Sequence, residues 1–465
     1  MFSKYLKKKK EIVKKLIADL GEKYEFASIL ATDVKGMVYA VDKSSTVIRP
    51  SSVSECGFVL RVNTNGLIYE YSFSELTEKN IDEVKKGIEE LINKKASSKK
   101  VDVTLNKEEE IKKDFVRKSK GKKYSDNEII DKLKELRDYG FSLDERVLNC
   151  QVSFESIEYN KMYISKNKEL TQFYTYDNPR CYCLVKDGDN IKYAYDGFGG
   201  NNPDEEFVLL KDSIKETVNL AIELLGATMP TPGKYTIITD PSITGLIAHE
   251  AFGHGVEMDM FVKDRAKSQE YKNKEVASSL VTMHDGASAT FSSASYFFDD
   301  EGVLAQDTVI IDKGILIGGL CDSVSAGILK YHPTGNGRRE SFKRKVYTRM
   351  TNTFFDKNKD KLEGMIASTE YGYYICATNN GMEDPKNWGI QCTALYGREI
   401  VNGKFTGKIV SPVVMSGYVI DLLESIEAVS NTKKIIGSGG CGKGYKEWVR
   451  VSDGGASIKA TVKIG

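Results

Sequence analysis

The sequence predicts an α+β fold with an N-terminal α+β region, a middle α/β region and a strand-rich C-terminal domain. Three observations support this class. The chain of 465 residues is too long for one ordinary hydrophobic core. Helical and strand-like patterns alternate in its first half, whereas strand-like runs and turn residues dominate after residue 232. Pro230, Pro232 and a change in composition mark the boundaries, which we predict as 1–95, a charged connector at 96–127, 128–232 and 233–465.

The first region begins with a helix and continues with strands. One side of the predicted helix is apolar and carries Ile12, Val13, Leu16, Ile17 and Leu20. Strand-like runs follow at 25–31 and 57–63. The turn signal Asn65-Gly66 joins the second run to 67–71, which predicts a hairpin. A charged helix is expected over about 80–94.

Lysine and serine dominate the connector at 96–127, and apolar residues are few there. We interpret it as a solvated linker, and the alternative is a basic contact surface. The middle region then combines helices near 128–138 and 207–225 with predicted strands, which lie at 152–159, 173–176 and 181–185. In the C-terminal domain, the run 308–316 is typical of a hairpin with a tight turn.

The composition excludes several classes of protein. A net charge of +1 gives no general attraction to nucleic acid or to an acidic membrane, so neither is expected as a partner. No apolar run approaches the roughly 18–20 residues that span a bilayer. The basic start is followed by an amphipathic pattern that a secretory signal would lack, so we expect a cytoplasmic protein. Eight scattered cysteines do not form a disulfide scaffold, and Cys181-x-Cys183 lacks the matching pair of a zinc site.

The motif with most chemical content is His249-Glu250-x-x-x-His254, which holds two of the four histidines. Asp240 can cap a helix that begins at Pro241 and leads into it. Residues five apart lie about 140° apart around a regular helix, so both rings cannot face one ion. A π-type turn would realign them, and we therefore predict a bulged or prematurely ended helix. The alternative is an ordinary helix whose histidines face different directions.

Two imidazoles suit Zn²⁺, so the C-terminal domain is expected to carry a metal-binding helix. Glu250 adjoins the first histidine, as a general base would in a zinc peptidase. The third ligand remains open between Glu257, which a continuing helix would bring within reach, Asp259, which that geometry favours less, and Cys441. Cys441 lies in a glycine-rich segment that also matches a nucleotide-binding pattern, but too little chain follows it to form a βαβ unit.

Three segments resemble the TldD/PmbA family of metallopeptidases. They are 249–257, then 333–341 with 349–353, and the Cys441-Gly442-Lys443 stretch. The resemblance implies a zinc peptidase with His249, His254 and Cys441 as ligands and Glu250 as the catalytic residue. It also implies a homodimer, or a heterodimer with a TldE/PmbA-like subunit that lacks the metal motif. This chain keeps the complete motif, which is typical of the active TldD-type subunit. Met258 departs from the family pattern, which usually has glycine there.

The resemblance further implies that extended peptides are held by backbone hydrogen bonds, which fits short or unfolded substrates and broad sequence tolerance. Asn336, Arg338 and Arg339 are candidates for binding a peptide carboxylate. The alternative is that they form a structural turn with salt bridges. A rival function is a catalytically silent TldE-like scaffold subunit, and another is a redox or structural zinc protein.

Overall fold

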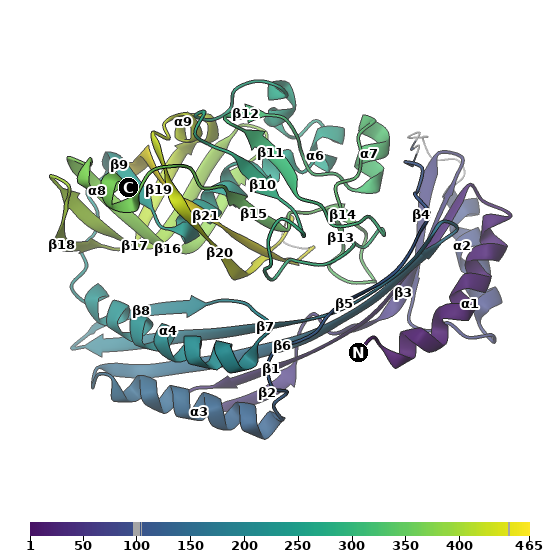
Figure 1. Cartoon of the computed structure of the whole chain (residues 1–465), viewed down its shortest axis with the longest axis horizontal. Helices are drawn as coiled ribbons and strands as arrows, with labels where there is room; N and C mark the ends of the chain where they lie inside the picture. Colours follow the sequence, from purple (N-terminus) through teal and green to yellow (C-terminus); the bar gives the residue numbers. More distant parts are fainter. Residues whose placement is uncertain (96–102, 104, 445–446) are drawn as a thin grey trace.

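A computed structural model describes residues 1–95, 103, 105–444 and 447–465 of the chain. It has the predicted α+β class, because two large sheets carry helices on their faces and at their ends (Figure 1). The first sheet is long and curved, and the strand-rich C-terminal domain lies against its concave face (Figure 1).

The first sheet contains eight described strands in the order β4-β3-β1-β6-β7-β5, with β2 paired to β1 and β8 to β7. The strands are β1 Phe26–Val41, β2 Thr46–Pro50, β3 Glu55–Thr64, β4 Leu67–Phe73, β5 Ile111–Arg117, β6 Val147–Ser165, β7 Lys168–Asp187 and β8 Asn190–Gly197. The central pair, β1 and β6, is antiparallel from Ser28↔Ser165 to Val41↔Val152. Strands from 1–95 and from 128–232 therefore form one continuous sheet. Whether these segments fold as separate units stays a prediction.

Local sequence signals explain several of these elements. The predicted hairpin is confirmed as β3 and β4, and Asn65 and Gly66 both take the positive φ that a tight turn requires. Part of the expected connector is ordered instead, because residues 111–117 form β5 in parallel pairing with β7. Phe115 contributes to this order, because its ring stacks on Phe297 of the C-terminal domain at 5.1 Å between centroids. Residues 96–102 and 104 of that connector lie outside the described residues.

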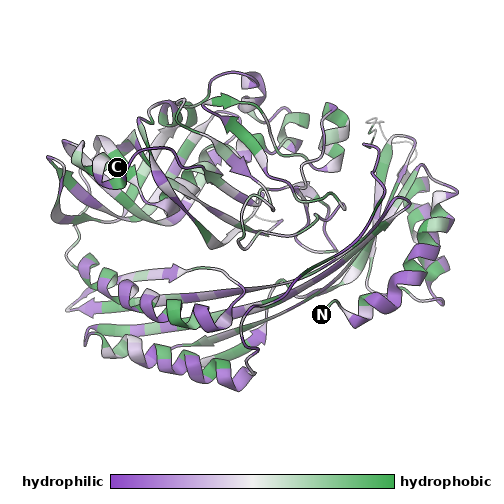
Figure 2. Cartoon of the chain, in the orientation of Figure 1, coloured by the Kyte–Doolittle hydropathy of each residue, from purple (hydrophilic) through white to green (hydrophobic). Residues whose placement is uncertain are grey.

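Helices cover the first sheet at its two ends (Figure 1). The helices α1 Lys4–Gly21 and α2 Ile81–Lys95 share one hydrophobic core with β1 and β3. The helices α3 Asp126–Ser142 and α4 Pro203–Leu224 share another with β6 and β7. Hydrophobic and hydrophilic stripes alternate on these helices, as their sequence periodicity predicts (Figure 2).

The second sheet contains eleven described strands in the order β12-β11-β10-β15-β21-β19-β17-β16-β9, with β18 paired to β17 and β20 to β21. These strands are β9 Gly233–Thr239, β10 Met283–Asp285, β11 Thr308–Asp312, β12 Ile315–Leu316, β15 Asn352–Phe355, β16 Tyr371–Asp384, β17 Gly389–Val401, β18 Lys404–Val410, β19 Val413–Tyr418, β20 Ala428–Cys441 and β21 Val449–Ile464. All come from residues after 232, which confirms the strand-rich C-terminal domain. The predicted hairpin at 308–316 is β11 and β12.

Short elements complete the C-terminal domain. They are the small ladder of β13 Gly337–Arg338 and β14 Tyr347–Thr348, and the helices α5 Pro241–Leu246, α6 Asp259–Val262, α7 Ser323–Leu329, α8 Leu362–Ala367 and α9 Val419–Glu424. Within the described ranges, we find no helix with the length and apolar character that crossing a bilayer demands.

Ion pairs join the C-terminal domain to the concave face of the first sheet. Each pair links a residue of the sheet to one after residue 232: Arg61–Glu301, Lys161–Asp300, Glu70–Arg339 and Glu155–Arg450. The hydroxyl of Tyr176 in β7 also donates to the carbonyl of Gly437 in β20. The side chains of these pairs are largely shielded from water, so the ion pairs hold the first sheet and the C-terminal domain in one arrangement.

Two buried carboxyl groups lie where β7 meets the start of α4. Asp177 and Glu206 are 2% and 3% exposed, and each has one carboxylate oxygen without a hydrogen-bond partner among the described residues. Burial, with the nearby charge of Asp177, raises the pKa of Glu206 to about 8. The folded protein therefore holds a proton on Glu206 that the unfolded chain releases at lower pH.

We predict that Glu206→Gln becomes increasingly stabilising, relative to wild type, as the pH rises from 5 to 8. Because folded wild type keeps a proton on Glu206 that the unfolded chain releases, its free energy of unfolding falls over this window by at most about 1.4 kcal/mol per pH unit. The amide of the variant does not titrate, so the variant does not show this decrease. Urea unfolding at several pH values measures the effect, with Glu205→Gln on the exposed side of the same turn as control. A difference between Glu206→Gln and wild type that is independent of pH would contradict this.

Candidate metal centre

The helix that carries the histidine motif begins where the sequence predicts. Asp240 follows β9, and its carboxylate accepts a hydrogen bond of 2.8 Å from the Ile243 N–H. Pro241 occupies the first turn, where its missing N–H costs nothing. The α-helical turns end at Leu246, and residues Ile247–Gly253 form a π-helix, followed by a 3₁₀ turn at His254–Val256. The predicted bulge is thus confirmed as a π-helical segment.

The π-helical segment brings the two histidine rings together. The ring centroids of His249 and His254 lie 5.1 Å apart, with an angle of 86° between their planes. Gly253 between them is required for space, because a Cβ there would lie 2.2 Å from the sulfur of Met350. Its φ of −59° is open to any residue, so conformational freedom is not the reason for this glycine.

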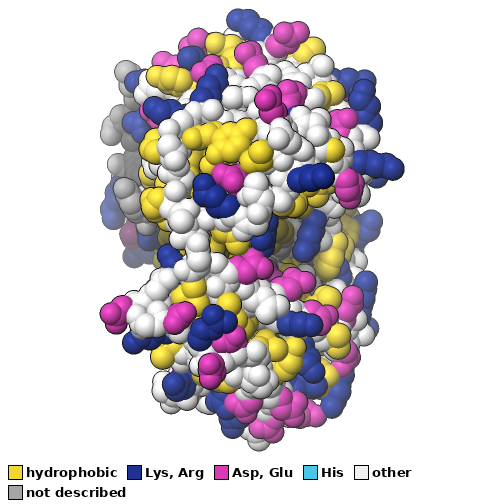
Figure 3. Space-filling view, turned by 90° about the vertical axis from the view of Figure 1, so that its left-hand side faces the viewer, with side chains coloured by type: hydrophobic (Ala, Val, Ile, Leu, Met, Phe, Trp, Pro, Cys, Tyr) yellow, Lys and Arg dark blue, Asp and Glu magenta, His cyan; other side chains and the backbone are white. Residues whose placement is uncertain are grey.

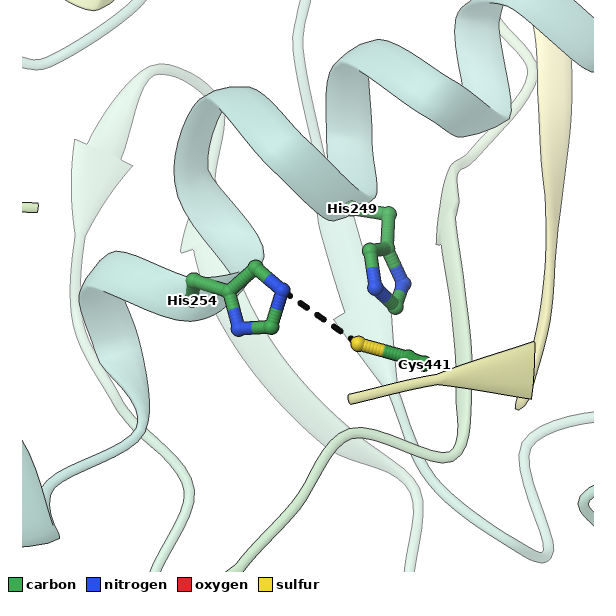
Figure 4. A group of neighbouring side chains, drawn as sticks. All are labelled: His249, His254 and Cys441. Carbon is green, nitrogen blue, oxygen red and sulfur yellow. Dashed lines mark hydrogen bonds between the residues drawn. The ribbon is translucent and has the colours of Figure 1, made fainter. Parts of the chain in front are cut away.

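Cys441 approaches this pair from the far end of the chain (Figure 4). It is the last residue of β20 and pairs with Val449 of β21. Its Sγ lies 3.4 Å from Nε2 of His254. One potential ligand atom from each of His249, His254 and Cys441 lies within 4.8 Å of the others. Of the three candidates for a third ligand, the structure brings Cys441 to the histidines.

The donor set fits a divalent metal ion such as zinc. His254 uses Nδ1 for Glu257, at 3.2 Å from Oε2, which leaves Nε2 directed at the sulfur. Nδ1 of His249 is buried and has no hydrogen-bond partner among the described residues. Two imidazole nitrogens and a thiolate are ligands that zinc accepts, and an ion would satisfy the unpaired group.

The charge states of these groups also favour a metal. Burial raises the pKa of the Cys441 thiol, but the neighbouring His249 and His254 outweigh it and bring the pKa down to about 5. Burial lowers the pKa of His249, but Cys441 and Glu250 outweigh it and raise the pKa to about 8. The site thus holds a thiolate that attracts positive charge, which is the form in which cysteine binds metals.

Glu257, another candidate ligand from the sequence, is engaged with protein groups instead. It is 0% exposed, and its Oε2 contacts His254 Nδ1 at 3.2 Å and Lys443 Nζ at 3.1 Å. Its Oε1 accepts from Arg349 Nε at 3.3 Å and from the Met350 N–H at 3.2 Å. Such a carboxylate behind a candidate ligand histidine fixes the orientation of the ring. Asp259 is also occupied, by Lys443 at 2.6 Å.

Arg349 connects the histidine side of the site to the cysteine side. Its guanidinium is fully buried, and Nη2 lies 3.0 Å from both the carbonyl oxygen and the Sγ of Cys441. Together with the contact to Glu257, this fixes both segments that carry the candidate ligands to one cation. Only the family resemblance indicates this residue from the sequence, because Arg349 begins the matching segment 349–353.

Two further carboxylates lie beside the rings. Glu250 has its Oε1 4.0 Å from Nε2 of His249. Glu383 of β16 has both oxygens buried without a hydrogen-bond partner among the described residues, and it faces Gly255. Burial raises the pKa of Glu383 well above its ordinary value. No local pattern in the sequence indicates Glu383, because 128 positions separate it from Gly255 and only the folding of β16 brings them together.

The segment with Asn336, Arg338 and Arg339 makes contacts within the protein. Asn336 donates to Asp285 at 2.8 Å and to the Arg349 carbonyl at 3.0 Å. Arg338 donates to the Met350 carbonyl at 2.6 Å, and Arg339 pairs with Glu70 of the first sheet. These contacts match the structural alternative that the sequence left open. A role in binding substrate stays a prediction.

Comparison with known proteins identifies a protein family that the chain resembles. Residues 232–457 match a family model described as the PmbA/TldA metallopeptidase C-terminal domain. A metalloprotease of Methanocaldococcus jannaschii is 29% identical over 414 residues, which cover 86% of this chain and 89% of that protein. A metalloprotease TldD homologue of Buchnera aphidicola is 31% identical over 274 residues, which cover 56% of each chain.

Two solved structures share the fold. A Thermotoga maritima protein, named for modulation of a DNA gyrase, has a TM-score of 0.79 at 18% identity and covers 98% of this chain and 100% of its own. TldE from Thermococcus kodakarensis has a TM-score of 0.73 at 16% identity and covers 97% and 99%. At these identities the likeness concerns the fold alone.

We predict that Glu257→Gln lowers the free energy of unfolding by about 3–5 kcal/mol, because the buried cations of Arg349 and Lys443 lose their shared carboxylate. Denaturant unfolding measures this. Glu363→Gln on the exposed surface of α8 is the control and should stay within about 0.5 kcal/mol of wild type. An unchanged unfolding midpoint for Glu257→Gln would refute the structural role of this carboxylate.

Proposed function

Because the chain belongs to the TldD/PmbA family of metallopeptidases, we propose that it is a zinc-dependent peptidase. Its substrates are short or unfolded peptides, which it hydrolyses with broad sequence tolerance. One observation carries the proposal: Cys441 meets His249 and His254 beside Glu250, although 187 positions separate the cysteine from His254.

In this proposal the chain's own residues divide the work. His249, Nε2 of His254 and Sγ of Cys441 hold the ion, and Glu257 and Arg349 keep these ligands in position. When bound, zinc supplies a Lewis acid that polarises the scissile carbonyl and lowers the pKa of water. Glu250 takes the proton of the attacking water on its carboxylate and passes it to the leaving amine.

The substrate's path follows the end of β20. Among the described strands, β20 pairs only with β21. Residues 358–360 bond to its first part, and Tyr176 and Arg349 bond to the carbonyls of Gly437 and Cys441, so a peptide would have to use the remaining backbone groups of its other edge. An extended peptide that pairs with this edge would run toward Cys441, where β20 ends. Recognition through backbone hydrogen bonds demands little of side chains, which supports broad sequence tolerance.

The assembly and location are further parts of the proposal. We propose a dimer, either of two copies of this chain or with a TldE/PmbA-like subunit, and the fold shared with TldE supports that partner. All eight cysteines lie among the described residues and none forms a disulfide, which supports the cytoplasm as location. A silent scaffold role is less well supported, because the complete donor set would have no use there.

The general base is tested by Glu250→Gln. The amide cannot accept the water's proton, so cleavage of unstructured peptides should fall by about 10²–10⁴-fold while bound zinc stays near wild type. Peptide cleavage followed by mass spectrometry and metal analysis measure the two effects. Glu275→Gln, on an exposed segment, should cleave as wild type does. Full activity of Glu250→Gln would remove this residue from its proposed role.

Metal dependence is tested by a chelator and by the cysteine ligand. Chelation should abolish cleavage and added Zn²⁺ should restore it. Cys441→Ser should weaken zinc affinity by at least about 10–100-fold. Loss of a residue that only hydrogen-bonds to a metal ligand typically has this effect, and Cys441 is proposed to bind the ion directly. Competition with a fluorescent zinc indicator measures the affinity, and Cys56→Ser, an exposed cysteine, is the control. Cleavage that survives complete metal removal would overturn the proposed function.

A further inference from the structure

A cavity of about 500 Å³ lies between the concave face of the first sheet and the strand end that carries Cys441. Its walls come from β1, β2, β6 and β7 on one side and from β20 and β21 on the other. Gly439 and Gly440 line it directly, and they immediately precede Cys441. The cavity therefore adjoins the segment of β20 that leads to Cys441, although no candidate metal ligand lines it, and none of the roles described above uses it.

The charged lining of this cavity is mainly positive. It contains three guanidinium groups, from Arg49, Arg180 and Arg450, and one carboxylate, from Glu155. Seen from the end of the molecule, a hollow separates the upper and lower parts, and both basic and acidic side chains lie around it (Figure 3). The cavity itself has more basic than acidic side chains in its lining, which favours anionic groups over cationic ones.

Two of the guanidinium groups are held in place before any ligand arrives. Arg450 pairs with Glu155, and the two side chains are only 14% and 15% exposed. With its amide oriented to satisfy its neighbours, Asn178 accepts hydrogen bonds from Arg180 at 2.9 Å and from Arg450 at 3.2 Å. One amide oxygen thus fixes both groups side by side. The terminal nitrogens of Arg450 already donate to Glu155 and Asn178, so Arg180 is the guanidinium group of this pair that we place against a ligand carboxylate.

We propose that this cavity is a subsite for a carboxylate of the bound peptide, either an acidic side chain or the free C-terminus. The proposal rests on the peptidase function and names a substrate preference within it. Gly439 is two residues before Cys441, and strand residues advance about 3.3 Å each. The carboxylate therefore belongs about two or three residues from the scissile bond, where the peptide runs beside β20.

The preference is tested with three peptides that share one scissile bond. The first has an internal Glu near that bond and an amidated C-terminus, the second has Gln in its place, and the third has Gln and a free C-terminus close to the bond. Wild type should cleave the first or the third with a kcat/KM about tenfold or more above the second, as expected for charge-assisted hydrogen bonds. Whichever of the two is preferred identifies the source of the carboxylate.

Arg180→Gln should remove most of this preference and change kcat/KM for the neutral peptide by less than about threefold. Arg180 is exposed, so this variant should fold. Substitutions at Glu155 or Arg450 are less suitable, because both side chains are largely buried. Arg398→Gln, at an arginine that pairs with Glu223 away from the cavity, should behave as wild type does. Equal cleavage of all three peptides by wild type would overturn the subsite but leave the peptidase function standing.

A binding measurement separates the subsite from catalysis. Fluorescence anisotropy of the three labelled peptides, in the zinc-loaded Glu250→Gln protein, should reproduce the same order of affinity and the same loss in the Glu250→Gln/Arg180→Gln protein. If wild type cleaves none of the peptides yet binding still depends on Arg180 and a carboxylate, the subsite stands and the peptidase proposal fails. Binding that is equal for all three peptides would refute the subsite whatever the activity.

Discussion

The candidate site depends on one contact across the fold, between Sγ of Cys441 and Nε2 of His254 at 3.4 Å. Two separate structural features must both be present for this contact to form. The π-helical segment Ile247–Gly253 must rotate His254 toward His249, and β20 must keep its pairing with β21 as far as Cys441. A regular α-helix would turn the rings about 140° apart, and a slip of β20 by one residue would direct the sulfur to the opposite face.

A buried set of charges keeps this contact in place. Glu257 touches His254, Arg349 touches both Glu257 and Cys441, and Lys443 adds a second cation on Glu257. Burying such groups is costly unless each is paired, so they tolerate few alternative arrangements. The contacts between the first sheet and the C-terminal domain act in the same way at longer range, because Glu155 binds Arg450 of β21 and Tyr176 binds Gly437 of β20, the two strands that pair at Cys441.

The sequence predicted those features that local patterns encode. Apolar periodicity located the long helices, and Asn65-Gly66 located a hairpin. The spacing of His249 and His254 predicted the irregular helix, because one ion imposes a geometric condition on two nearby residues. The third ligand could not be chosen in this way. Glu257 and Cys441 remained open on spacing alone, and only the family resemblance pointed to the cysteine.

The features that the sequence did not predict depend on distant pairing. The alternation of polar and apolar residues within β1 and within β6 does not identify which strands pair. The continuity of the first sheet therefore cannot be predicted from this pattern. Residues 111–117 are interpreted from the sequence as part of a solvated linker, because lysines dominate the connector. The sequence does not show that Phe115 of this segment packs against the C-terminal domain. Glu383 and the paired guanidinium groups of Arg180 and Arg450 are also products of tertiary structure, and no local motif marks them.

The most direct test of this account is X-ray absorption spectroscopy at the zinc edge of the metal-loaded protein, which reports the atoms bonded to the ion. The account predicts one sulfur at about 2.3 Å and two imidazole nitrogens at about 2.0–2.1 Å, with the sulfur signal absent in Cys441→Ser. A first shell of nitrogen and oxygen alone in the wild-type protein would contradict it, because Cys441 would then have no part in binding the metal.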